Sequence, residues 1–453
     1  MPISNVSETN RQRWYQSDVT IGLSLVIFTI LLRSGIILGL RSELTVDIDA
    51  YLAIAQEIVA GNGFATPETG RPTAFRPPLY PLLLAGWLTI GPAAVGVAIL
   101  HVLFSAGTVW LTYFAGLRLM LSKFPSALAG LFIACDPLLA RYAALPMTET
   151  LATFLASGLL FLSFGSDRKT QIIRGICFGL AVLCRPTFWV FGGFAMLAWI
   201  TDAWRNRSKS PLRCLVQQVP WITVLAVAVV VLPWVVRNTI VLGRPILMTT
   251  HGGYTLLLGN NATFAREVVE QPFGTVWEGE SLRRWQASLE QDMSTHGIAT
   301  DDEFARDRYL RDRAVRFIRR EPGTFFRASW LRFRRFWGID PPASAVEAIG
   351  RLWTRFTGNV ELVPMVQNIV RWSVRLFYGL LFLAAIIGGY RMIRRPDWHP
   401  VFWLIVSLML VHLVYWSNAR MRAPTMPAIT LLAASVFHRQ RSENTDDERT
   451  SVV

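Results

Sequence analysis

Long apolar runs separated by short, arginine-rich loops constrain this chain more than any other feature. A helix needs about 20 mostly apolar residues to cross a bilayer. The short runs on either side of Arg185-Pro186 form either two helices that turn at the membrane surface or one broken helix, because proline removes a helix hydrogen bond. The predicted fold class is an all-α polytopic membrane protein. Ten segments are predicted to span the membrane: Val19–Leu40, Val95–Leu117, Ala127–Leu145, Thr150–Phe164, Ile172–Cys184, Thr187–Ala203, Val219–Val236, Ser373–Tyr390, Val401–Trp416 and Pro424–Phe437.

The composition supports a membrane-embedded chain and excludes most other classes. Hydrophobic residues make up 52% of the 453 residues and charged residues only 17%, whereas soluble domains are about 25% charged. These values exclude a soluble multidomain enzyme, a disordered tail and a fibrous repeat. The net charge of +14 comes from 42 Arg and three Lys against 31 acids, and much of it flanks the apolar runs. Charge in those positions sets topology, so the expected partner is a lipid bilayer and not a nucleic acid.

Basic residues in the short loops predict the orientation of the spans, because Lys and Arg concentrate on the cytoplasmic side. The first run is too long for the core of a cleaved signal peptide and is predicted to be retained. The run Leu79–Gly91 has only 13 residues and contains Pro81, which favours an interfacial or re-entrant helix over a span. With a cytoplasmic N-terminus, ten spans place five basic segments in the cytoplasm: Arg118–Lys123, Asp167–Arg174, Trp204–Arg213, Arg391–Trp398 and the tail after His438.

The same topology predicts which segments face outward. In the longest of them, Asp301–Arg320 has apolar residues at helical spacing and Arg on the other side, which predicts an amphipathic helix. The predicted organisation is a membrane module over residues 1–258 with a first outer loop at 41–78, an extracytoplasmic segment at 259–371, C-terminal transmembrane helices at 372–437 and a cytoplasmic tail at 438–453. The outward segments are Arg41–Pro78, the turn around Glu149, the Arg185-Pro186 turn, Arg237–Arg371 and Ser417–Arg422.

Two carboxylates, Asp47 and Asp49, open the first outer loop just beyond the first span. The residues Leu52–Val59 are apolar at helical spacing and are followed by Gly61-Asn62-Gly63, which predicts a short helix in the membrane interface. Acids before a helix are stabilised by its dipole. The alternatives are therefore a functional pair and a pair that only caps this helix.

Two further acids interrupt apolar sequence. Glu149 stands at the outer junction of two predicted spans, where an ionisable residue is a functional candidate. The alternative places it in the first turn of a helix capped by Thr148. Asp136 precedes Pro137 and is predicted to hold a hydrogen-bonded kink.

Several arginines are predicted on the same outer side as Asp47 and Glu149. The guanidinium group binds phosphate through a fixed fork of donors, so a lipid phosphate of the outer leaflet is a natural partner. For any single arginine the alternative is contact with ordinary lipid head groups. Convergence with two carboxylates on one side favours a site. The arginines concerned are Arg76, Arg185, Arg237, Arg420 and Arg422.

Short motifs follow one another along most of the chain, from about residue 20 to 437. They are Asp47-x-x-x-Tyr51 with Ala55 and Gly61-x-Gly63; Arg76-Pro77-Pro78-Leu79-Tyr80-Pro81; Glu149 after an apolar run; Gly179-Leu180-x-x-Leu183-x-Arg185-Pro186; Pro233-Trp234-x-x-Arg237-Asn238; Gly243, Gly252-Gly253 and Gly259-Asn260-Asn261; Arg320-x-Pro322 and Arg334-Arg335-Phe336-Trp337; and Arg420-x-Arg422-x-Pro424. In this order and spacing they resemble the GT-C superfamily of membrane glycosyltransferases, within it the bacterial branch related to protein O-mannosyltransferases and to the lipid A aminoarabinose transferase.

The resemblance implies a GT-C-like bundle of about ten transmembrane helices and a hexosyl or pentosyl transferase. Such an enzyme takes a sugar from a polyprenyl-phosphate donor on the extracytoplasmic side and passes it to an acceptor protein, lipid or glycan. It also implies a bacterial inner membrane protein with both termini in the cytoplasm. One branch binds a metal through an acid just before the first-loop proline, whereas this chain has Arg76 there. A divalent metal is thus neither required nor excluded, and no other cofactor is implied.

Residue roles follow from the same resemblance. Asp47 stands four residues before Tyr51 and is predicted to be the general base of an inverting single displacement, with Asp49 as a neighbour that tunes it. Glu149 takes the place of the second acid and would orient the acceptor or share the role of base. The arginines, led by Arg185, Arg237 and Arg76, would hold the carrier phosphate as it leaves. Further substrate contacts are expected from Tyr51, Tyr80, Asn238 and His251.

Two other classes of function compete with a transferase. A lipid or solute transporter or flippase would use a broken helix such as the one at Arg185-Pro186, but it predicts paired half-sequences and charges at the centres of spans. A membrane scaffold with a partner-binding outer segment predicts no acid–arginine site. The sequence has no visible repeat and places most polar groups at the outer ends of the spans, which favours the transferase.

Overall fold

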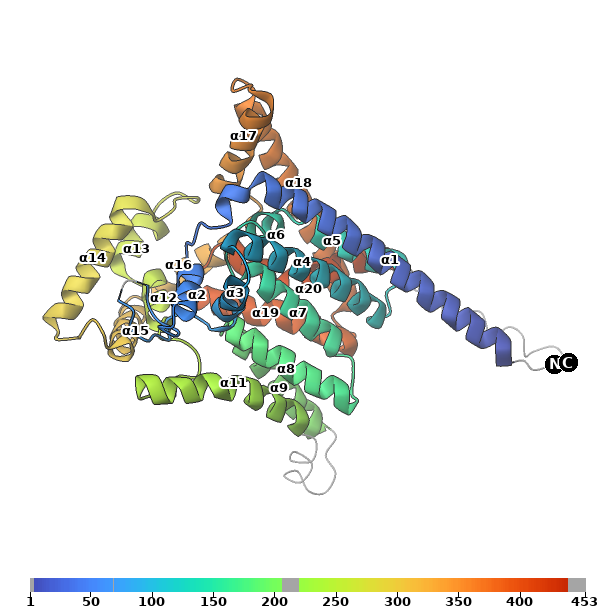
Figure 1. The fold of residues 1–453 in the computed structure, drawn as a ribbon, viewed down its shortest axis with the longest axis horizontal. Coiled ribbons are helices and arrows are strands. Elements are labelled where there is room, and N and C mark those ends of the chain that lie inside the picture. Colours follow the sequence, from blue (N-terminus) through green and yellow to red (C-terminus); the bar gives the residue numbers. More distant parts are fainter. Residues whose placement is uncertain (1–3, 68, 206–219, 439–453) are drawn as a thin grey trace.

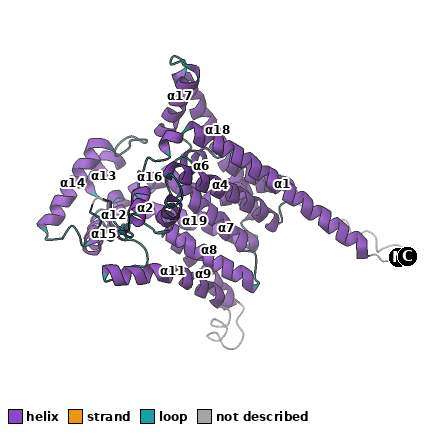
Figure 2. Ribbon diagram, viewed as in Figure 1, coloured by secondary structure: helices purple, strands orange, loops and turns teal. Residues whose placement is uncertain are grey.

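A computed structural model describes residues 4–67, 69–205 and 220–438 of the chain. Helices joined by loops make up this part, in which the only β contact is an isolated bridge between Ala65 and Pro72 (Figure 2). The predicted all-α class is confirmed. The tail after His438 and most of the predicted basic segment Trp204–Arg213 lie outside the described residues. The first half contains α1 (Ser4–Gly39), α2 (Tyr51–Val59), α3 (Leu79–Leu88), α4 (Ala93–Arg118), α5 (Lys123–Ala134), α6 (Pro137–Tyr142), α7 (Glu149–Leu162), α8 (Arg168–Cys184), α9 (Phe188–Arg205) and α11 (Trp221–Leu242).

The second half consists of an outer group of helices followed by three helices that return to the bundle (Figure 1). A short 3₁₀ helix, η4 (Ala419–Thr425), stands between the last two helices of the bundle. The helices are α12 (Gly252–Gly259), α13 (Ala262–Phe264), α14 (Gly279–Thr295), α15 (Glu303–Arg320), α16 (Pro322–Phe336), α17 (Ala343–Thr357), α18 (Val363–Met392), α19 (His399–Val414) and α20 (Met426–Ala434).

Five of the described helical segments are long and apolar enough to cross a membrane, and each coincides with a predicted span. The other predicted spans correspond to shorter helices in α5–α6, α7, α8, α9 and α20. A membrane-embedded helical bundle is therefore supported, whereas the number of ten spans stays a prediction. The five long segments are Gln16–Gly39, Ala93–Arg118, Trp221–Leu242, Val363–Met392 and Pro396–Val414.

The third predicted span, Ala127–Leu145, is broken where α5 ends and α6 begins. Asp136 caps α6 by accepting a hydrogen bond from the backbone N–H of Leu139 at 2.8 Å, and Pro137 occupies the first helical position. The hydroxyl of Tyr378 donates to the same oxygen of Asp136 at 3.1 Å. The prediction of a hydrogen-bonded kink at Asp136 is confirmed.

The last predicted span is a short helix and not a long one. All nine residues of α20 are buried, and 3₁₀ turns flank it on both sides. Its packing against α18, α5 and α19 explains why an apolar run there need not face lipid.

Small residues allow close packing of α8 against α11. Gly175 and Gly179 lie one turn apart on α8, where a Cβ at Gly175 would lie 2.5 Å from the carbonyl oxygen of Thr223 on α11. Spacing of this kind lets the backbones of two membrane helices approach closely. In Figure 1, α8, α9 and α11 accordingly form one group along the lower edge of the bundle. The chain turns between α8 and α9 at Arg185-Pro186, so these runs form two helices.

A second core stabilises the outer group of helices. Its buried side chains include Trp277, Trp285, Leu289 and Met293, which pack with Leu310 of α15. The predicted amphipathic helix over Asp301–Arg320 is confirmed as α15, with Asp302 capping its start. Figure 1 shows this group at one end of the molecule, on α12 to α15.

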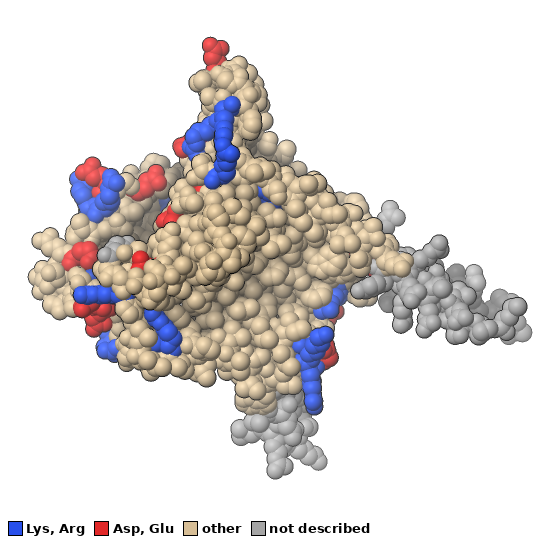
Figure 3. Space-filling view, viewed as in Figure 1, with Lys and Arg blue, Asp and Glu red and all other residues tan. Residues whose placement is uncertain are grey.

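Charged side chains are segregated on the face drawn in Figure 3. They gather over the outer helices and α17 at one end and near the ends of α8 and α9 at the other. The surface between these groups is almost free of charge on this face. An apolar belt between two charged ends is the pattern expected of a bundle that sits in a bilayer.

Gly388 offers a test of the bundle packing. A Cβ at this position of α18 would overlap the carbonyl oxygen of Leu432 on α20, whereas a Cβ at Gly379 of the same helix would meet nothing within 4 Å. Gly388→Ala is expected to lower the free energy of unfolding by about 1–3 kcal/mol, because an overpacked helix contact must open. Gly379→Ala is the control and is expected to be neutral or to stabilise by up to about 1 kcal/mol. Thermal unfolding of the two purified variants in detergent checks this, and equal midpoints would contradict the packing.

Candidate active site

A turn within the first outer loop places Asp47 over the start of α2. Ala50 has φ +59°, a left-handed conformation that costs a non-glycine residue on the order of 1–3 kcal/mol. The turn lets one carboxylate oxygen of Asp47 accept a hydrogen bond from the backbone N–H of Ala53 at 2.8 Å. This bond satisfies an N–H group that a helix leaves unpaired at its start. The predicted helix over Leu52–Val59 is confirmed, and one oxygen of Asp47 does cap it.

The other oxygen of Asp47 is buried and has no hydrogen-bond partner among the described residues. Burial raises the pKa of Asp47 above its ordinary value; backbone N–H groups at the start of α2 oppose the rise, and the negative charge of Asp49 adds to it. A carboxylate with one fixed oxygen, one free oxygen and an increased proton affinity is equipped to accept a proton.

Asp49 has the opposite environment although it is only two residues away. Its two oxygens pair with Arg76 at 3.3 Å and with Arg420 at 3.1 Å. Burial would raise the pKa of Asp49, but the guanidinium groups of Arg420 and Arg76 outweigh it and hold the pKa below the ordinary value. Asp49 is therefore a fixed anion that positions two arginines.

Glu149 is the first residue of α7 and is fully buried. Arg185 approaches one of its oxygens to 2.8 Å and Arg420 approaches the same oxygen to 3.6 Å. Neither contact has hydrogen-bond alignment, so both oxygens of Glu149 lack an aligned donor among the described residues. The side chain of Thr148 does not cap α7; its hydroxyl accepts from Nε of Arg185 at 2.9 Å instead. Thr148 and Glu149 therefore both contact Arg185, and the side chain of Thr148 does not act as a helix cap.

The structure brings five predicted residues into one ion-pair network, with Asp47 at its edge. Arg420 joins the first-loop carboxylate to the acid of α7, because it contacts both Asp49 and Glu149. Arg76 keeps the most free donors, since only its Nη2 is paired and its buried Nε has no partner among the described residues. The network consists of Asp49, Arg76, Glu149, Arg185 and Arg420.

Aromatic side chains form one wall beside this network. The ring of Tyr51 packs edge-on against Tyr80 at 5.5 Å, and the guanidinium of Arg76 lies 5.6 Å from the centre of the Tyr51 ring. The Tyr80 hydroxyl lies 2.8 Å from Nε2 of His101, whose Nδ1 lies 3.0 Å from the carbonyl oxygen of Ala143. A carbonyl only accepts, so Nδ1 carries a proton and, in the neutral ring, Tyr80 donates to Nε2. The sequence did not single out His101, because it lies within the apolar run of α4.

His251 lies at the outer side of the network. Its ring packs against Phe75 at 4.1 Å and Tyr254 at 5.2 Å. Burial, together with the positive charge of Arg76, lowers the pKa of His251 to about 3, so the ring is neutral near pH 7. In the part of the chain that the structure describes, no three His, Cys, Asp or Glu side chains are grouped closely enough to hold a metal ion.

Two of the predicted phosphate-binding arginines lie outside the network. Arg237 donates to the carbonyl oxygens of Thr73 and Phe64, each at 2.7 Å, and to the side chain of Asn238 at 3.0 Å. Asn238 in turn donates to the carbonyl of Ile246 at 3.0 Å. These bonds tie the first outer loop and the chain after α11 to that helix. The structure thus gives Arg237 and Asn238 contacts that hold loops in place.

Arg422 is likewise committed to the protein interior. It is 1% exposed, donates to the carbonyl oxygens of Phe336 and Gly338, and lies 4.2 Å from the centre of the Tyr378 ring. Arg420 is two residues away on the same 3₁₀ helix and faces the carboxylates. The Arg-x-Arg motif therefore places one arginine in the network and the other in the core between α16 and α18.

Glu303, which the sequence did not single out, connects the outer helices to the first loop. Its carboxylate accepts from the hydroxyl of Thr73, the backbone N–H of Ala74 at 3.1 Å and the hydroxyl of Thr250 at 2.8 Å. These three contacts hold together the chain before Arg76, the chain before His251 and the start of α15. The only sequence signal was an acid at the start of an amphipathic helix, which is common in the first helical turn.

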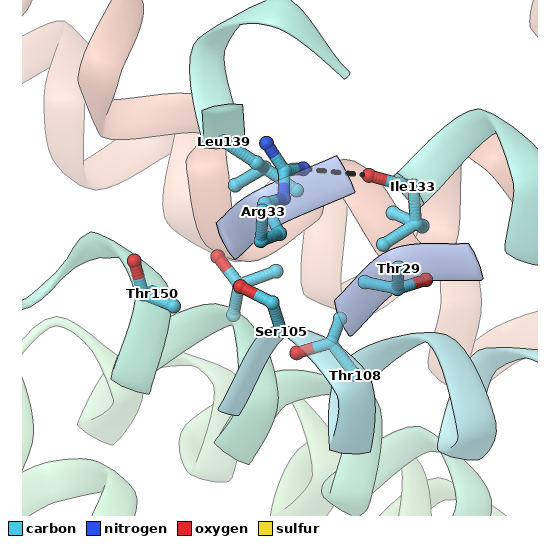
Figure 4. Close-up of a pocket in the computed structure, with 8 residues that line it drawn as sticks. Thr29, Arg33, Ser105, Thr108, Ile133, Leu139 and Thr150 are labelled. Carbon is cyan, nitrogen blue, oxygen red and sulfur yellow. Dashed lines mark hydrogen bonds between the residues drawn. The ribbon is translucent and has the colours of Figure 1, made fainter. Parts of the chain in front are cut away.

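A small polar cavity lies inside the bundle next to α7 (Figure 4). Arg33 of α1 points into it, is 1% exposed, and donates to the carbonyl oxygen of Ile133 at 3.1 Å. Hydroxyl side chains surround it, among them Thr108 and Thr150 (Figure 4). The cavity has a volume of about 10 Å³ within which the centre of a water molecule can lie. That is enough room for about one water molecule. The cavity is too small for a sugar or a phosphate.

Comparisons with known proteins give only distant similarities. No family model and no curated protein matches the chain. The chain is similar to the archaeal oligosaccharyltransferase AglB from Archaeoglobus fulgidus in complex with an inhibitory peptide and a dolichol-phosphate, at 13% identity and a TM-score of 0.46, over 92% of this chain and 50% of that one. Two further structures of the Archaeoglobus fulgidus oligosaccharyltransferase, one tethered to an acceptor peptide and one in the apo form, give TM-scores of 0.45 and 0.44 at 13% identity, over 92% of this chain and 49% and 50% of theirs. The chain thus spans about half the length of these structures, and its function is argued from its own site.

Proposed function

We propose that this chain is an integral membrane glycosyltransferase that moves a sugar from a polyprenyl-phosphate donor to an acceptor on the extracytoplasmic face. The observation that carries the proposal is Asp47, with one buried carboxylate oxygen free, two residues from Asp49 of a buried acid–arginine network at the ends of apolar helices. The ordered motifs that resemble the GT-C superfamily support the same reading. The first outer loop at 41–78 and the segment at 259–371 would then face away from the cytoplasm, and the termini would lie inside.

The proposed reaction is a single displacement with inversion. The acceptor hydroxyl attacks the anomeric carbon of the sugar, and its proton passes to the free oxygen of Asp47. The bond between that carbon and the phosphate oxygen breaks, and its electron pair leaves with the polyprenyl phosphate. The leaving group is a stable anion, so no acid is needed to protonate it. Glu149, whose oxygens lack aligned donors, would orient the acceptor hydroxyl or share the role of base.

Arg76 is the best placed of the arginines to receive the carrier phosphate. Its unpaired donors are available while Nη2 stays on Asp49. Arg185 and Arg420 are more fully occupied by Glu149 and Asp49, and they would fix the geometry of the site. Charge-assisted hydrogen bonds from such preorganised donors stabilise the charge that develops on the leaving phosphate. The lipid chain of the donor would lie against the apolar helices.

The direct test is transfer of a labelled sugar. Purified protein in lipid nanodiscs is incubated with radiolabelled polyprenyl-phosphate mannose, glucose or arabinose and with peptide, lipid and glycan acceptors. Label that appears on an acceptor, and that requires Asp47, supports the proposal. Label that only changes leaflet in proteoliposomes, with no acceptor labelled, would instead support a flippase.

The raised pKa of Asp47 predicts the pH dependence of the reaction. A general base works only when deprotonated, so kcat/KM is expected to fall as the pH drops through the pKa of Asp47. Because burial raises that pKa, the half-maximal rate is expected above the ordinary aspartate value of 3.8. Neutral His251, with a pKa of about 3, does not contribute a limb in that range. A profile that stays flat down to pH 4 would contradict a base with a raised pKa.

A further inference from the structure

A larger cavity lies in the outer group of helices, away from the carboxylate network. It has a volume of about 350 Å³ and is bordered by α12, α13, α14 and α15. That volume is within the range of small-molecule binding sites. Its apolar part is formed by Leu257, Ala262 and Phe317.

Three arginines from one face of α15 line the polar part of this cavity. Arg313, Arg316 and Arg320 are spaced by three and four residues, so their side chains lie on the same side of the helix. The one acid in the lining, Asp292, already pairs with Arg313 and accepts from the hydroxyl of Tyr309 at 2.6 Å. Arg316 and Arg320 make no hydrogen bond or ion pair with any residue that the structure describes. The cavity therefore presents two uncompensated positive charges.

The remaining polar lining does not offer free acceptors. Asn261 donates to the carbonyl of Leu257 at 2.8 Å, and its side-chain oxygen accepts from the backbone N–H of Phe264 at 2.8 Å. The groups left to bind a ligand are guanidinium donors beside an apolar surface. This combination suits an anionic group, such as a phosphate or a carboxylate, carried on a carbon skeleton of about the size of a sugar.

We propose that this cavity binds an anionic group of the acceptor, a step that rests on the proposed transferase function. The start of α15 is tied to the first loop through Glu303, and Arg316 lies 13 residues further along the helix. At 1.5 Å per residue that separation is about 20 Å along the helix, and no residue of the ion-pair network lines the cavity. Because the proposed function places the donor phosphate at Arg76, we assign the anionic group in this separate cavity to the acceptor.

Binding of soluble probes tests the cavity without requiring turnover. The full-length protein in phosphatidylcholine nanodiscs is titrated by calorimetry with mannose 6-phosphate, glucuronate and neutral mannose. The two anions are expected to bind and mannose is not. The variant Arg316→Gln/Arg320→Gln is expected to weaken binding of the anions about tenfold, because two charge-assisted contacts are lost. The control Arg311→Gln/Arg319→Gln removes the same charge from α15 at positions that are exposed, as Arg316 and Arg320 are, but lie outside the cavity, and it is expected to bind as the wild type does.

The outcomes distinguish an acceptor site from a lipid head-group site and from binding outside the cavity. Equal affinity of the two double variants would overturn the assignment to the cavity. If neither soluble anion binds, and sugar transfer occurs only when the nanodisc contains anionic lipid, the assignment to the acceptor would be overturned in favour of a lipid head group. In the transfer assay, Arg316→Gln/Arg320→Gln is expected to raise KM about tenfold for an anionic acceptor and to leave kcat unchanged. If the wild-type protein binds the two anions but transfers no sugar to any acceptor, the result would count against the transferase function and not against the cavity as a binding site.

Discussion

Replacement of Asp47 by Asn is expected to lower the rate of sugar transfer by about 10²–10⁴-fold, the usual contribution of a general base. The amide cannot take the proton of the acceptor hydroxyl. Its carbonyl oxygen can still accept the hydrogen bond from the N–H of Ala53, so the start of α2 should stay intact. The variant is therefore expected to keep its thermal stability and its donor affinity while kcat falls.

The control for this variant is Asp301→Asn in the outer segment. Asp301 is about half exposed, and its one ion-pair partner among the described residues is the exposed Arg71 at 3.1 Å, so its loss should change neither stability nor transfer measurably. Rates are measured with the labelled donor at saturating acceptor, together with unfolding midpoints in detergent. A wild-type rate for Asp47→Asn would remove Asp47 as the base. A loss of rate accompanied by a lower unfolding midpoint would show that the residue acts through the structure of α2.

Local elements of this fold could be predicted because their signals are local. The helix after Asp49 follows from apolar spacing and from glycines that can take positive φ, and Gly61 and Gly63 do so at +89° and +72°. The same holds for α15, whose apolar face packs on the second core through Leu310 and Ala314. The kink at Asp136 needed only a short polar side chain before a proline.

Pairing between distant segments could not be predicted in the same way. Asp49 meets Arg420 across 371 residues, and nothing in either motif distinguishes Arg420 from Arg422, which enters the core instead. The different surroundings of Asp47 and Asp49 could not be predicted either, because they depend on the left-handed turn at Ala50 and on the distant partner Arg420. The sequence predicted that these arginines lie on one side of the membrane, whereas tertiary packing determines which of them contact carboxylates.

The buried contact between Arg185 and Glu149 leads to the second large expected effect. Glu149 is fully buried and the side chain of Arg185 is 13% exposed, so water can do little to stabilise either charge alone. Arg185→Met removes the cation and leaves Glu149 with only Arg420 at 3.6 Å. Removal of one partner of a buried ion pair typically costs about 3–5 kcal/mol, and the remaining arginine favours the lower end, about 3 kcal/mol.

A double variant distinguishes the effect of an unpaired buried charge from the effect of lost side-chain packing. Arg185→Met/Glu149→Gln removes both charges and is expected to recover most of the stability that Arg185→Met loses, since no uncompensated carboxylate remains. Arg394→Met is the matched control, because Arg394 is exposed and makes no hydrogen bond or ion pair with a residue that the structure describes. Unfolding midpoints in detergent are measured for these three variants and for the single variant Glu149→Gln, which completes the cycle. If the effects of Arg185→Met and Glu149→Gln simply add, the two side chains do not form the coupled pair on which the ion-pair network depends, and Arg185 would be free to bind the carrier phosphate directly.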